Sequence, residues 1–313
     1  MTARKKVLIT GATGFIGRYL VEALLAGNDF DVVVAGRRCP ELPSESGLEF
    51  FDVGEINGGS DWRESLHGVQ AVIHLAGLAH LNKRASSAAQ QFHQVNVQGT
   101  LNLANQAEGA GVTHFLFMSS IGVNGNSNHQ PFTVSDTPAP KELYAESKMH
   151  AEQQLKSQLV DSSMALTIVR PPLVYGPNAP GNFGLLCSIV KKPLPLPLAG
   201  IQNRRSFVSV WNLVDLLIRC LKDDASKGKT FLVRDGQDVS TSDFLRLIGD
   251  ASGYGVRLFR VSHSFLKLAA ACLGKKASYD RLFDSLLVDD SYTREVLGWT
   301  PPLTLEESLR KCF

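Results

Sequence analysis

The stretch that decides the fold is Val7-Leu-Ile-Thr-Gly11-Ala-Thr-Gly14-Phe-Ile-Gly17, near the start of a chain of 313 residues. It contains an apolar strand, a glycine turn and the beginning of a helix, in the order that a dinucleotide site requires. The first glycine permits a tight turn, the second lets the backbone approach a pyrophosphate, and the third allows close packing of helix on strand. The helix N-terminus adds free N–H groups and partial positive charge. The expected cofactor contacts here are Gly11, Gly14, Phe15, Ile16 and Gly17.

The pattern around this stretch predicts the fold class. Short β-branched runs alternate with helical patterns, which is typical of parallel strands joined by crossover helices. Runs that are apolar throughout, such as 7–9 and 32–34, suit a sheet covered on both faces. We therefore expect a doubly wound parallel α/β Rossmann domain over residues 1–170. Its expected strands are 6–10, 31–35, 48–52, 71–76, 114–119 and 166–170, and its expected helices are 14–26, 62–66, 87–109 and 142–159.

The amino-acid pattern of the sequence changes after residue 170. Seven prolines between positions 171 and 197 argue against long regular elements in that segment. We expect a smaller mixed α/β substrate-binding region over residues 171–313, with a strand at 230–233 that could rejoin the main sheet. A further strand is expected at 206–210, and helices at 212–222, 242–251 and 262–273. Thr304-Leu-Glu-Glu307 has the spacing of a capping box before a last helix.

Charge and composition exclude several function classes. The formal charge of +2, with 32 basic and 30 acidic residues, gives no footprint for nucleic acid. Five scattered cysteines are typical of a reducing compartment, and a strand within a few residues of the N-terminus leaves no room for a signal peptide, so we expect a cytoplasmic protein. The apolar segment 265–273 is too short to span a membrane and contains Lys267, which predicts a buried or interfacial helix rather than membrane insertion.

The end of the second strand bears on the choice of cofactor. A cofactor with a free 2′-hydroxyl usually meets an acidic residue there, but this chain has Gly36, Arg37 and Arg38. A guanidinium can pair with a 2′-phosphate, which favours NADP(H), with Arg37 as its contact. The alternative is that the two arginines are ordinary solvated residues, so NAD(H) stays open.

The spacing Tyr144-Ala-Glu-Ser-Lys148 places a phenol and an ammonium on one face of a helix. Hydride transfer at a carbinol carbon needs a proton moved at its oxygen, and a free tyrosine, with a pKa of about 10, is a poor base near neutrality. A nearby ammonium favours the phenolate. The pair therefore indicates oxidoreductase chemistry.

These motifs together resemble the extended short-chain dehydrogenase/reductase family, which is the NAD-dependent epimerase/dehydratase family, over nearly the whole chain. The resemblance implies that Tyr144 is the acid/base, that Lys148 also binds the nicotinamide ribose, and that Ser120, with Ser119 as the fallback, hydrogen-bonds the reacting oxygen. His74 is expected to be a hydrogen-bonded core residue. The resemblance adds these cofactor-side residues: Asp52 and Val53 at the adenine, Leu75, Ala76 and Gly77 beside the ribose and phosphates, Asn96 as a structural amide, and Pro171.

The same resemblance implies a UDP-sugar substrate. Arg170-Pro-Pro-Leu-Val-Tyr-Gly-Pro177 resembles a segment of nucleotide-sugar epimerases and dehydratases, although Leu173 replaces an asparagine frequent there. The implied substrate contacts are Asn182, Arg205 and Arg281 on the diphosphate, Leu196 in a stretch that reads uracil, and Ser120 and Asn124 near the sugar.

Three functions follow from these residues. The first is reduction of a UDP-4-keto-6-deoxy-N-acetylhexosamine to UDP-QuiNAc or UDP-FucNAc for O-antigen lipopolysaccharide, which the whole-chain resemblance favours. The second is a UDP-glucose or UDP-N-acetylglucosamine 4-epimerase, which would use the same Tyr144, Lys148 and Ser120. The third is a non-catalytic NAD(P)-binding redox sensor, which the Tyr/Lys pair opposes. The helices at 87–109 and 142–159 resemble those of the family's four-helix-bundle homodimer.

Overall fold

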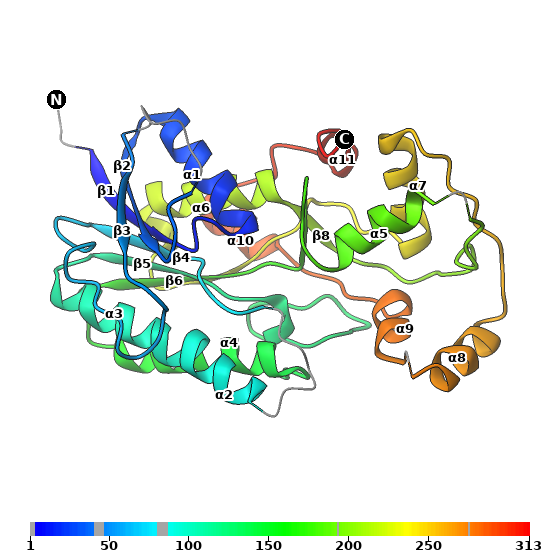
Figure 1. Ribbon diagram of the computed structural model, residues 1–313, viewed down its shortest axis with the longest axis horizontal. Helices are drawn as coiled ribbons and strands as arrows, with labels where there is room; N and C mark the ends of the chain where they lie inside the picture. Colours follow the sequence, from blue (N-terminus) through cyan, green and yellow to red (C-terminus); the bar gives the residue numbers. More distant parts are fainter. Residues whose placement is uncertain (1–3, 41–46, 80–86, 193, 275) are drawn as a thin grey trace.

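A seven-stranded parallel sheet forms the centre of the larger part of the molecule (Figure 1), in a computed structural model that describes residues 4–40, 47–79, 87–192, 194–274 and 276–313. The strand order is β3-β2-β1-β4-β5-β6-β9, so the chain winds outward from β1 in both directions. This order confirms the predicted doubly wound Rossmann sheet. The strands are β1 (Lys5–Thr10), β2 (Phe30–Gly36), β3 (Glu49–Asp52), β4 (Ala71–His74), β5 (His114–Met118), β6 (Ala165–Arg170) and β9 (Thr230–Leu232).

Helices cover both faces of this sheet, which explains why its strands are apolar throughout. Val7 and Ile9 of β1 pack toward one helical layer, while Leu8 packs toward the other. The first layer contains α1 (Phe15–Gly27), α6 (Val210–Lys222) and α10 (Ser291–Leu297). The second contains α2 (Ala88–Phe92), a π-helical turn (His93–Gly99), α3 (Thr100–Gly109) and α4 (Leu143–Gln158).

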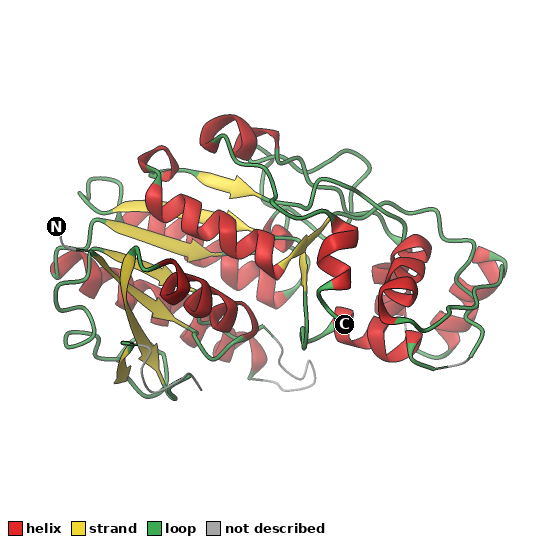
Figure 2. Cartoon of the chain, turned by 90° about the horizontal axis from the view of Figure 1, so that it is seen from above, coloured by secondary structure: helices red, strands yellow, loops and turns green. Residues whose placement is uncertain are grey.

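A smaller region with its own core extends beyond the sheet (Figure 2). Its centre is the stacked pair Phe207 and Phe244, whose ring centroids lie 4.0 Å apart. Thr304 and Glu307 form the predicted capping box. The elements of this region are β7 (Leu173–Tyr175), β8 (Phe207–Ser209), α5 (Asn182–Val190), α7 (Thr241–Ser252), α8 (His263–Cys272), α9 (Lys276–Phe283) and α11 (Leu305–Arg310), and short 3-10 turns lie at Ile121–Val123 and Asp224–Ser226.

The structure corrects several local predictions. The helix expected at 62–66 is a turn: Leu66 N–H donates to the Trp62 carbonyl, but Gly68 at φ +73° ends the turn before it can propagate. The proline-rich segment contains the nine-residue helix α5. The strand expected at 206–210 is shorter, because Ser209 caps α6 through the N–H of Asn212.

Two further features bear on composition. All five cysteines are free thiols in the structure. Across the described ranges, none of the helices has both the length and the apolar character that crossing a bilayer would require.

Candidate active site

Gly11 and Gly17 lie at positions between β1 and α1 where a side chain would have no room. Gly11 has φ +75°, and a Cβ there would lie 2.7 Å from the backbone nitrogen of Ala76. A Cβ on Gly17 would lie 2.1 Å from the Gly11 carbonyl oxygen. Gly14 is the N-cap of α1 and provides no side-chain cap, so the first N–H groups of the helix, at Phe15 and Ile16, remain available to an anion. The cradle therefore fits the pyrophosphate of a dinucleotide.

The ends of β2 and β3 lie side by side next to this loop. Gly36 pairs with Asp52 in the sheet, and Val53 N–H donates to the Gly36 carbonyl at 3.3 Å. The Arg37 side chain is 69% exposed, and its Nη1 lies 3.5 Å from the Glu55 carboxylate, a weak surface contact. Arg37 and Asp52 thus lie at the neighbouring ends of β2 and β3.

The end of β4 is held by two buried side chains. His74 has both ring nitrogens hydrogen-bonded, to Thr10 Oγ1 at 2.7 Å and Thr100 Oγ1 at 2.9 Å, and burial lowers its pKa to about 3. It is therefore the neutral core histidine that we expected. Asn96, in the π-helical turn, accepts from Leu78 N–H at 2.8 Å and donates to the Leu78 carbonyl at 2.9 Å. Together these residues fix the path of 75–78 past the candidate cofactor site.

Tyr144 and Lys148 lie on the first two turns of α4, and the Lys148 side chain reaches the end of β5. Lys148 is buried, its ammonium donates to the Met118 carbonyl at 2.8 Å, and it lies 4.5 Å from the centroid of the Phe117 ring. Burial lowers the pKa of Lys148 to about 8 against an opposing effect of Glu152, and burial raises the pKa of Tyr144 to about 12. A Cβ on Gly77 would lie 3.3 Å from Lys148 Nζ, so Lys148 also lies close to the loop after β4.

The two serines after β5 have different environments. Ser119 is buried, and its hydroxyl donates to Glu152 at 2.5 Å. Ser120 is only half-buried, and its oxygen accepts from Gly122 N–H at 3.1 Å. A Cβ on Gly122 would lie 3.1 Å from Ala145, the residue after Tyr144. Both serines thus lie near α4, but the Ser119 hydroxyl is taken up by Glu152, whereas Ser120 is half-buried on the turn that packs against Ala145.

A buried ion pair under this centre was not predicted. Arg170 and Glu152, with side chains 4% and 3% exposed, share two hydrogen bonds of 2.9 and 2.5 Å. Arg170 also donates to Asn124 Oδ1 at 2.9 Å, and Asn124 donates to the Thr133 carbonyl at 2.9 Å. The Asn124 side chain is thus occupied by protein partners, which differs from the substrate contact expected of it. The available signal was Glu152, four residues after Lys148 on the same helix face.

A pocket of about 100 Å³ in the smaller region brings together two predicted substrate residues, Asn182 and Arg205. Asn182 begins α5, and Arg205 Nη1 donates to the Asp284 carbonyl at 2.8 Å. Thr241 adds a hydroxyl. The other lining side chains are apolar: Leu173, Leu185, Leu186, Ile189, Phe207, Phe244 and Leu282. An arginine and an amide on an apolar wall suit a ligand with both a charged and a flat or apolar part.

The remaining predicted residues lie at the edges of this arrangement. Pro171 is buried, and its carbonyl accepts from Ile121 N–H at 3.0 Å, which joins the Ser120 turn to the smaller region. The N–H of Leu196 donates to the Arg257 carbonyl at 2.8 Å, so the chain itself occupies the backbone donor expected to read uracil. Arg281 is in α9, but its side chain lies outside the described residues.

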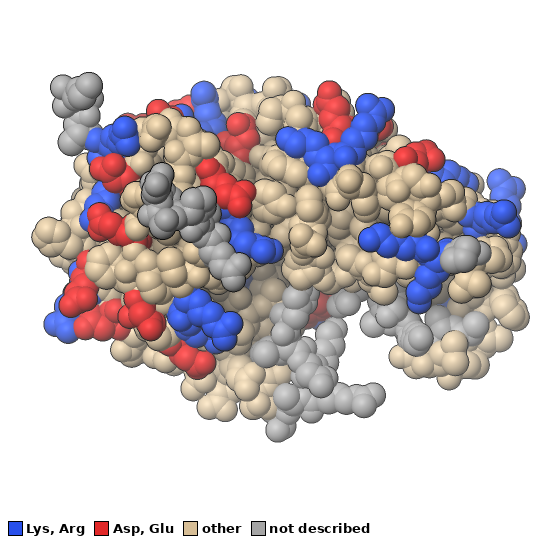
Figure 3. All heavy atoms as spheres, turned by 45° about the horizontal axis from the view of Figure 1, so that its top comes forward, with Lys and Arg blue, Asp and Glu red and all other residues tan. Residues whose placement is uncertain are grey.

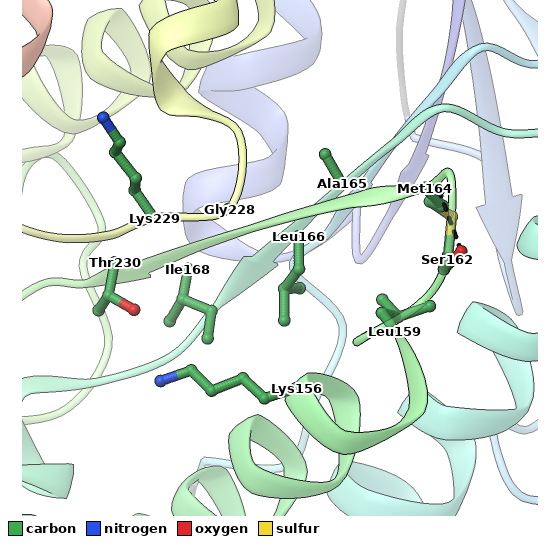
Figure 4. Close-up of a pocket in the computed structure, with 10 residues that line it drawn as sticks. All are labelled: Lys156, Leu159, Ser162, Met164, Ala165, Leu166, Ile168, Gly228, Lys229 and Thr230. Atoms are coloured by element: carbon green, nitrogen blue, oxygen red, sulfur yellow. Dashed lines mark hydrogen bonds between the residues drawn. The ribbon is translucent and has the colours of Figure 1, made fainter.

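A larger cavity, of about 300 Å³, lies away from these groups (Figure 4). Its walls come from the C-terminal end of α4 and from β6 and β9, and of its two lysines, Lys156 lies along the cavity while Lys229 points away from it. None of the candidate catalytic residues lines it. Among the residues that the structure describes, no three His, Cys, Asp or Glu side chains form a metal-binding group.

Comparison with known proteins agrees with this geometry. The model of the NAD dependent epimerase/dehydratase family matches residues 7–233. A UDP-glucose 4-epimerase of Vibrio cholerae is 40% identical over 311 residues, which cover 98% of this chain and 94% of that protein. An N-acetyl-alpha-D-glucosaminyl-diphospho-ditrans,octacis-undecaprenol 4-epimerase of Escherichia coli O157:H7 is 28% identical, covering 97% and 92% of the two chains.

Solved structures share the fold. A UDP-N-acetylglucosamine 4-epimerase from Methanobrevibacter ruminantium M1, in complex with UDP-N-acetylmuramic acid, superposes with a TM-score of 0.80 at 21% identity over 99% of this chain and 97% of that one. A UDP-glucuronic acid 4-epimerase from Bacillus cereus, in complex with NAD, gives a TM-score of 0.77 at 19% identity over 98% and 96%.

Proposed function

The chain belongs to the NAD-dependent epimerase/dehydratase family, and within it we propose an enzyme that transfers hydride at C4 of a UDP-sugar, as a UDP-hexose 4-epimerase. The observation that carries this proposal is the pair Tyr144 and Lys148 on one face of α4, with the Lys148 ammonium bonded to the Met118 carbonyl and close to Gly77, in the loop that packs against Gly11. The 40% identical V. cholerae relative, a UDP-glucose 4-epimerase by name, supports the reaction.

The candidate residues divide the chemistry as follows. A bound nicotinamide supplies the hydride acceptor and donor. Tyr144 removes the proton from the C4 hydroxyl and later returns it. Because burial raises the pKa of Tyr144 to about 12, its phenolate needs a nearby positive charge, which Lys148 provides in its protonated form. Ser120, on the turn packed against the start of α4, holds the reacting oxygen.

The pocket around Arg205 would bind the nucleotide end of the substrate. A guanidinium suits a diphosphate because it donates two parallel hydrogen bonds, and Asn182 adds an uncharged donor beside it. Phe207 and the leucines of the pocket offer an apolar surface to a uracil ring. Arg281, in α9, is proposed as a second diphosphate contact.

The second candidate is reduction of a UDP-4-keto-6-deoxy-N-acetylhexosamine, which would serve O-antigen synthesis. One observation favours it: β2 ends in Gly36, Arg37 and Arg38, with no acidic residue to select a free 2′-hydroxyl. Net reduction needs an exchangeable reduced cofactor, and NADPH is the one that Arg37 would favour. NAD use is favoured by the solved relatives that carry NAD.

Two incubations separate these reactions. The purified chain with NAD and UDP-glucose or UDP-N-acetylglucosamine should interconvert the C4 epimers without added reductant. Stoichiometric NADPH consumption with the 4-keto-6-deoxy substrate, and no epimer interconversion, would instead establish the reductase. In either reaction, Tyr144→Phe should abolish turnover and leave cofactor binding intact; a variant that still turns over would refute the acid/base assignment.

The cofactor preference has its own test. Arg37→Ala should weaken NADPH binding by about tenfold and leave NADH binding unchanged, because only NADPH offers a phosphate to the guanidinium. Arg63→Ala is a matched control, since Arg63 is an exposed arginine paired with Asp61 away from the loop. Equal weakening of both cofactors by Arg37→Ala would contradict the proposed 2′-phosphate contact.

We also propose a cytoplasmic homodimer. The five free thiols are typical of a reducing compartment. The layer of α2, the π-helical turn, α3 and α4 lies on one side of the sheet, where two copies could form a four-helix bundle (Figure 1). Sedimentation velocity measurements would establish the oligomeric state.

A further inference from the structure

Helix α8 carries an exposed apolar stripe at the far end of the smaller region (Figure 1). Phe265 and Leu268 are 63% and 64% exposed, and Leu273, just after the helix, is 71% exposed. Phe265, Leu268 and the exposed Cys272 follow helical spacing and so share one face. Single exposed apolar residues are common on protein surfaces, but a contiguous group marks an interaction surface.

The other side of α8 is fixed to the protein. The Tyr279 hydroxyl lies 2.5 Å from His263 Nδ1, and the His263 ring centroid lies 5.3 Å from that of Phe283. These contacts hold the first turn of α8 against α9. The contacts with α9 therefore hold α8 in place, and its apolar stripe faces outward.

The segment between Asp250 and Asp280, which carries this stripe, is positively charged. Residues 251–279 contain five basic and no acidic residues, whereas the rest of the chain has 27 basic and 30 acidic residues. Arg257, Arg260 and Lys267 are exposed. Figure 3 shows Lys and Arg atoms gathered over this end of the molecule. Phe259, 45% exposed, lies between the two arginines in the segment leading into α8.

We propose that α8 docks this chain on an anionic phospholipid surface. A short helix with an apolar face and basic flanks lies in the plane of a membrane, with its apolar side chains at the headgroup level. The cations then meet lipid phosphates, which explains the absence of acidic residues here. A second copy of this chain is a poorer occupant, because symmetric contact would bring one basic segment against another.

Docking through α8 would place the candidate substrate pocket beside the membrane. Leu282 of α9, one residue before the Phe283 that contacts His263, lines the pocket with Asn182 and Arg205. The docking surface shares no residue with the proposed catalytic group, so either proposal can fail alone.

Vesicle flotation with the purified full chain tests the docking. Phosphatidylcholine vesicles with about 30 mol% phosphatidylglycerol should bind the chain at least tenfold more tightly than pure phosphatidylcholine, and about 0.5 M salt should weaken that binding. Equal binding to both vesicle types, or binding to neither, would overturn the proposal.

Variants identify the surface. Phe265→Ser with Leu268→Ser, and separately Arg257→Glu with Lys267→Glu, should each lower binding at least tenfold. Val160→Ser is the matched control, since Val160 is 75% exposed just beyond α4, a helix that covers the sheet rather than one of the smaller region, and should leave binding unchanged. Circular dichroism and melting temperatures would verify folding.

Two results would contradict the assignment of this surface. One is a control variant that loses as much vesicle binding as the α8 variants. The other is a Phe265→Ser with Leu268→Ser variant that differs from the wild type in oligomeric state, measured by size-exclusion chromatography, but not in vesicle binding. That result would assign the stripe to contact with a second copy of the chain.

Discussion

Removing only one charge of the buried Glu152 and Arg170 pair should destabilise the protein more than removing both. Each side chain is almost completely buried, and the two share two hydrogen bonds of 2.9 and 2.5 Å. Glu152 also accepts from Ser119, and Arg170 also donates to Asn124, so no water replaces a missing partner without rearrangement. The perturbations are Glu152→Gln, Arg170→Met, and the double variant Glu152→Leu with Arg170→Met.

The magnitudes follow from burial. A single variant leaves an uncompensated charge inside the protein and should cost about 3–5 kcal/mol of unfolding free energy. The double variant removes both desolvation penalties and fills similar volume with apolar atoms. It should lie within about 2 kcal/mol of the wild type, although independent effects would add up to about 6–10 kcal/mol.

Urea unfolding of the four proteins at neutral pH measures these differences. Glu152 also opposes the effect of burial on Lys148, so Glu152→Gln should move the Lys148 pKa further below about 8. The alkaline limb of the kcat profile should then shift to lower pH.

Two results would refute this reasoning. A Glu152→Gln cost below about 1 kcal/mol would mean that the pair is solvated like a surface ion pair. A double variant that loses the sum of the two single losses would mean that the residues do not compensate one another.

Three more outcomes are expected. Gly17→Ala should abolish cofactor binding, measured by fluorescence titration, because its Cβ would lie 2.1 Å from the Gly11 carbonyl oxygen; Gly109→Ala, with nothing within 4 Å, should not change it. His74, with a pKa of about 3 when folded against about 6.5 when unfolded, contributes stability that is complete above pH 6.5 and lost as pH falls. Protonation of this residue alone should therefore lower the unfolding free energy of the wild type by about 2 kcal/mol between neutral pH and pH 5. A His74→Asn variant should lack that part of the pH dependence, measured by urea unfolding. Asn96→Leu leaves the backbone N–H and carbonyl that it clamps unpaired, and should cost about 2–4 kcal/mol and raise KM for the cofactor; an unchanged KM would mean that this loop is held by other contacts.

Local chemistry in the sequence predicted much of the fold. Periodicity and apolar runs located the six strands that precede residue 171, since a strand buried on both faces cannot contain polar residues without partners. The same logic failed where elements are short: 62–66 closes a single turn, and β7 is a three-residue strand whose partner, β8, lies over thirty residues away. Short elements depend on tertiary contacts that periodicity does not contain.

The candidate site divides in the same way. Glycine spacing and the Tyr144 to Lys148 interval are local, so their arrangement was predictable. The contacts of the Asn124 side chain and of the Leu196 backbone could not be predicted. Their hydrogen-bond partners, Arg170 and Arg257, come from distant segments of the chain. The buried ion pair of Glu152 was hard to predict for the same reason. A carboxylate on a helix is usually solvated, and it is buried only where the fold brings a partner such as a guanidinium next to it.

The sequence by itself determined the dinucleotide cradle, because Gly11 and Gly17 occupy positions where a Cβ would collide with backbone atoms. It also determined that a phenol and an ammonium share one face of a helix. Only the tertiary structure decided that Ser119 is bonded to Glu152 while Ser120 stays half-buried, that Asn182 and Arg205 line one pocket, and that the apolar face of α8 is left exposed. Those outcomes depend on which distant side chains take up each hydrogen bond and cover each surface, and that is settled only when the elements pack together.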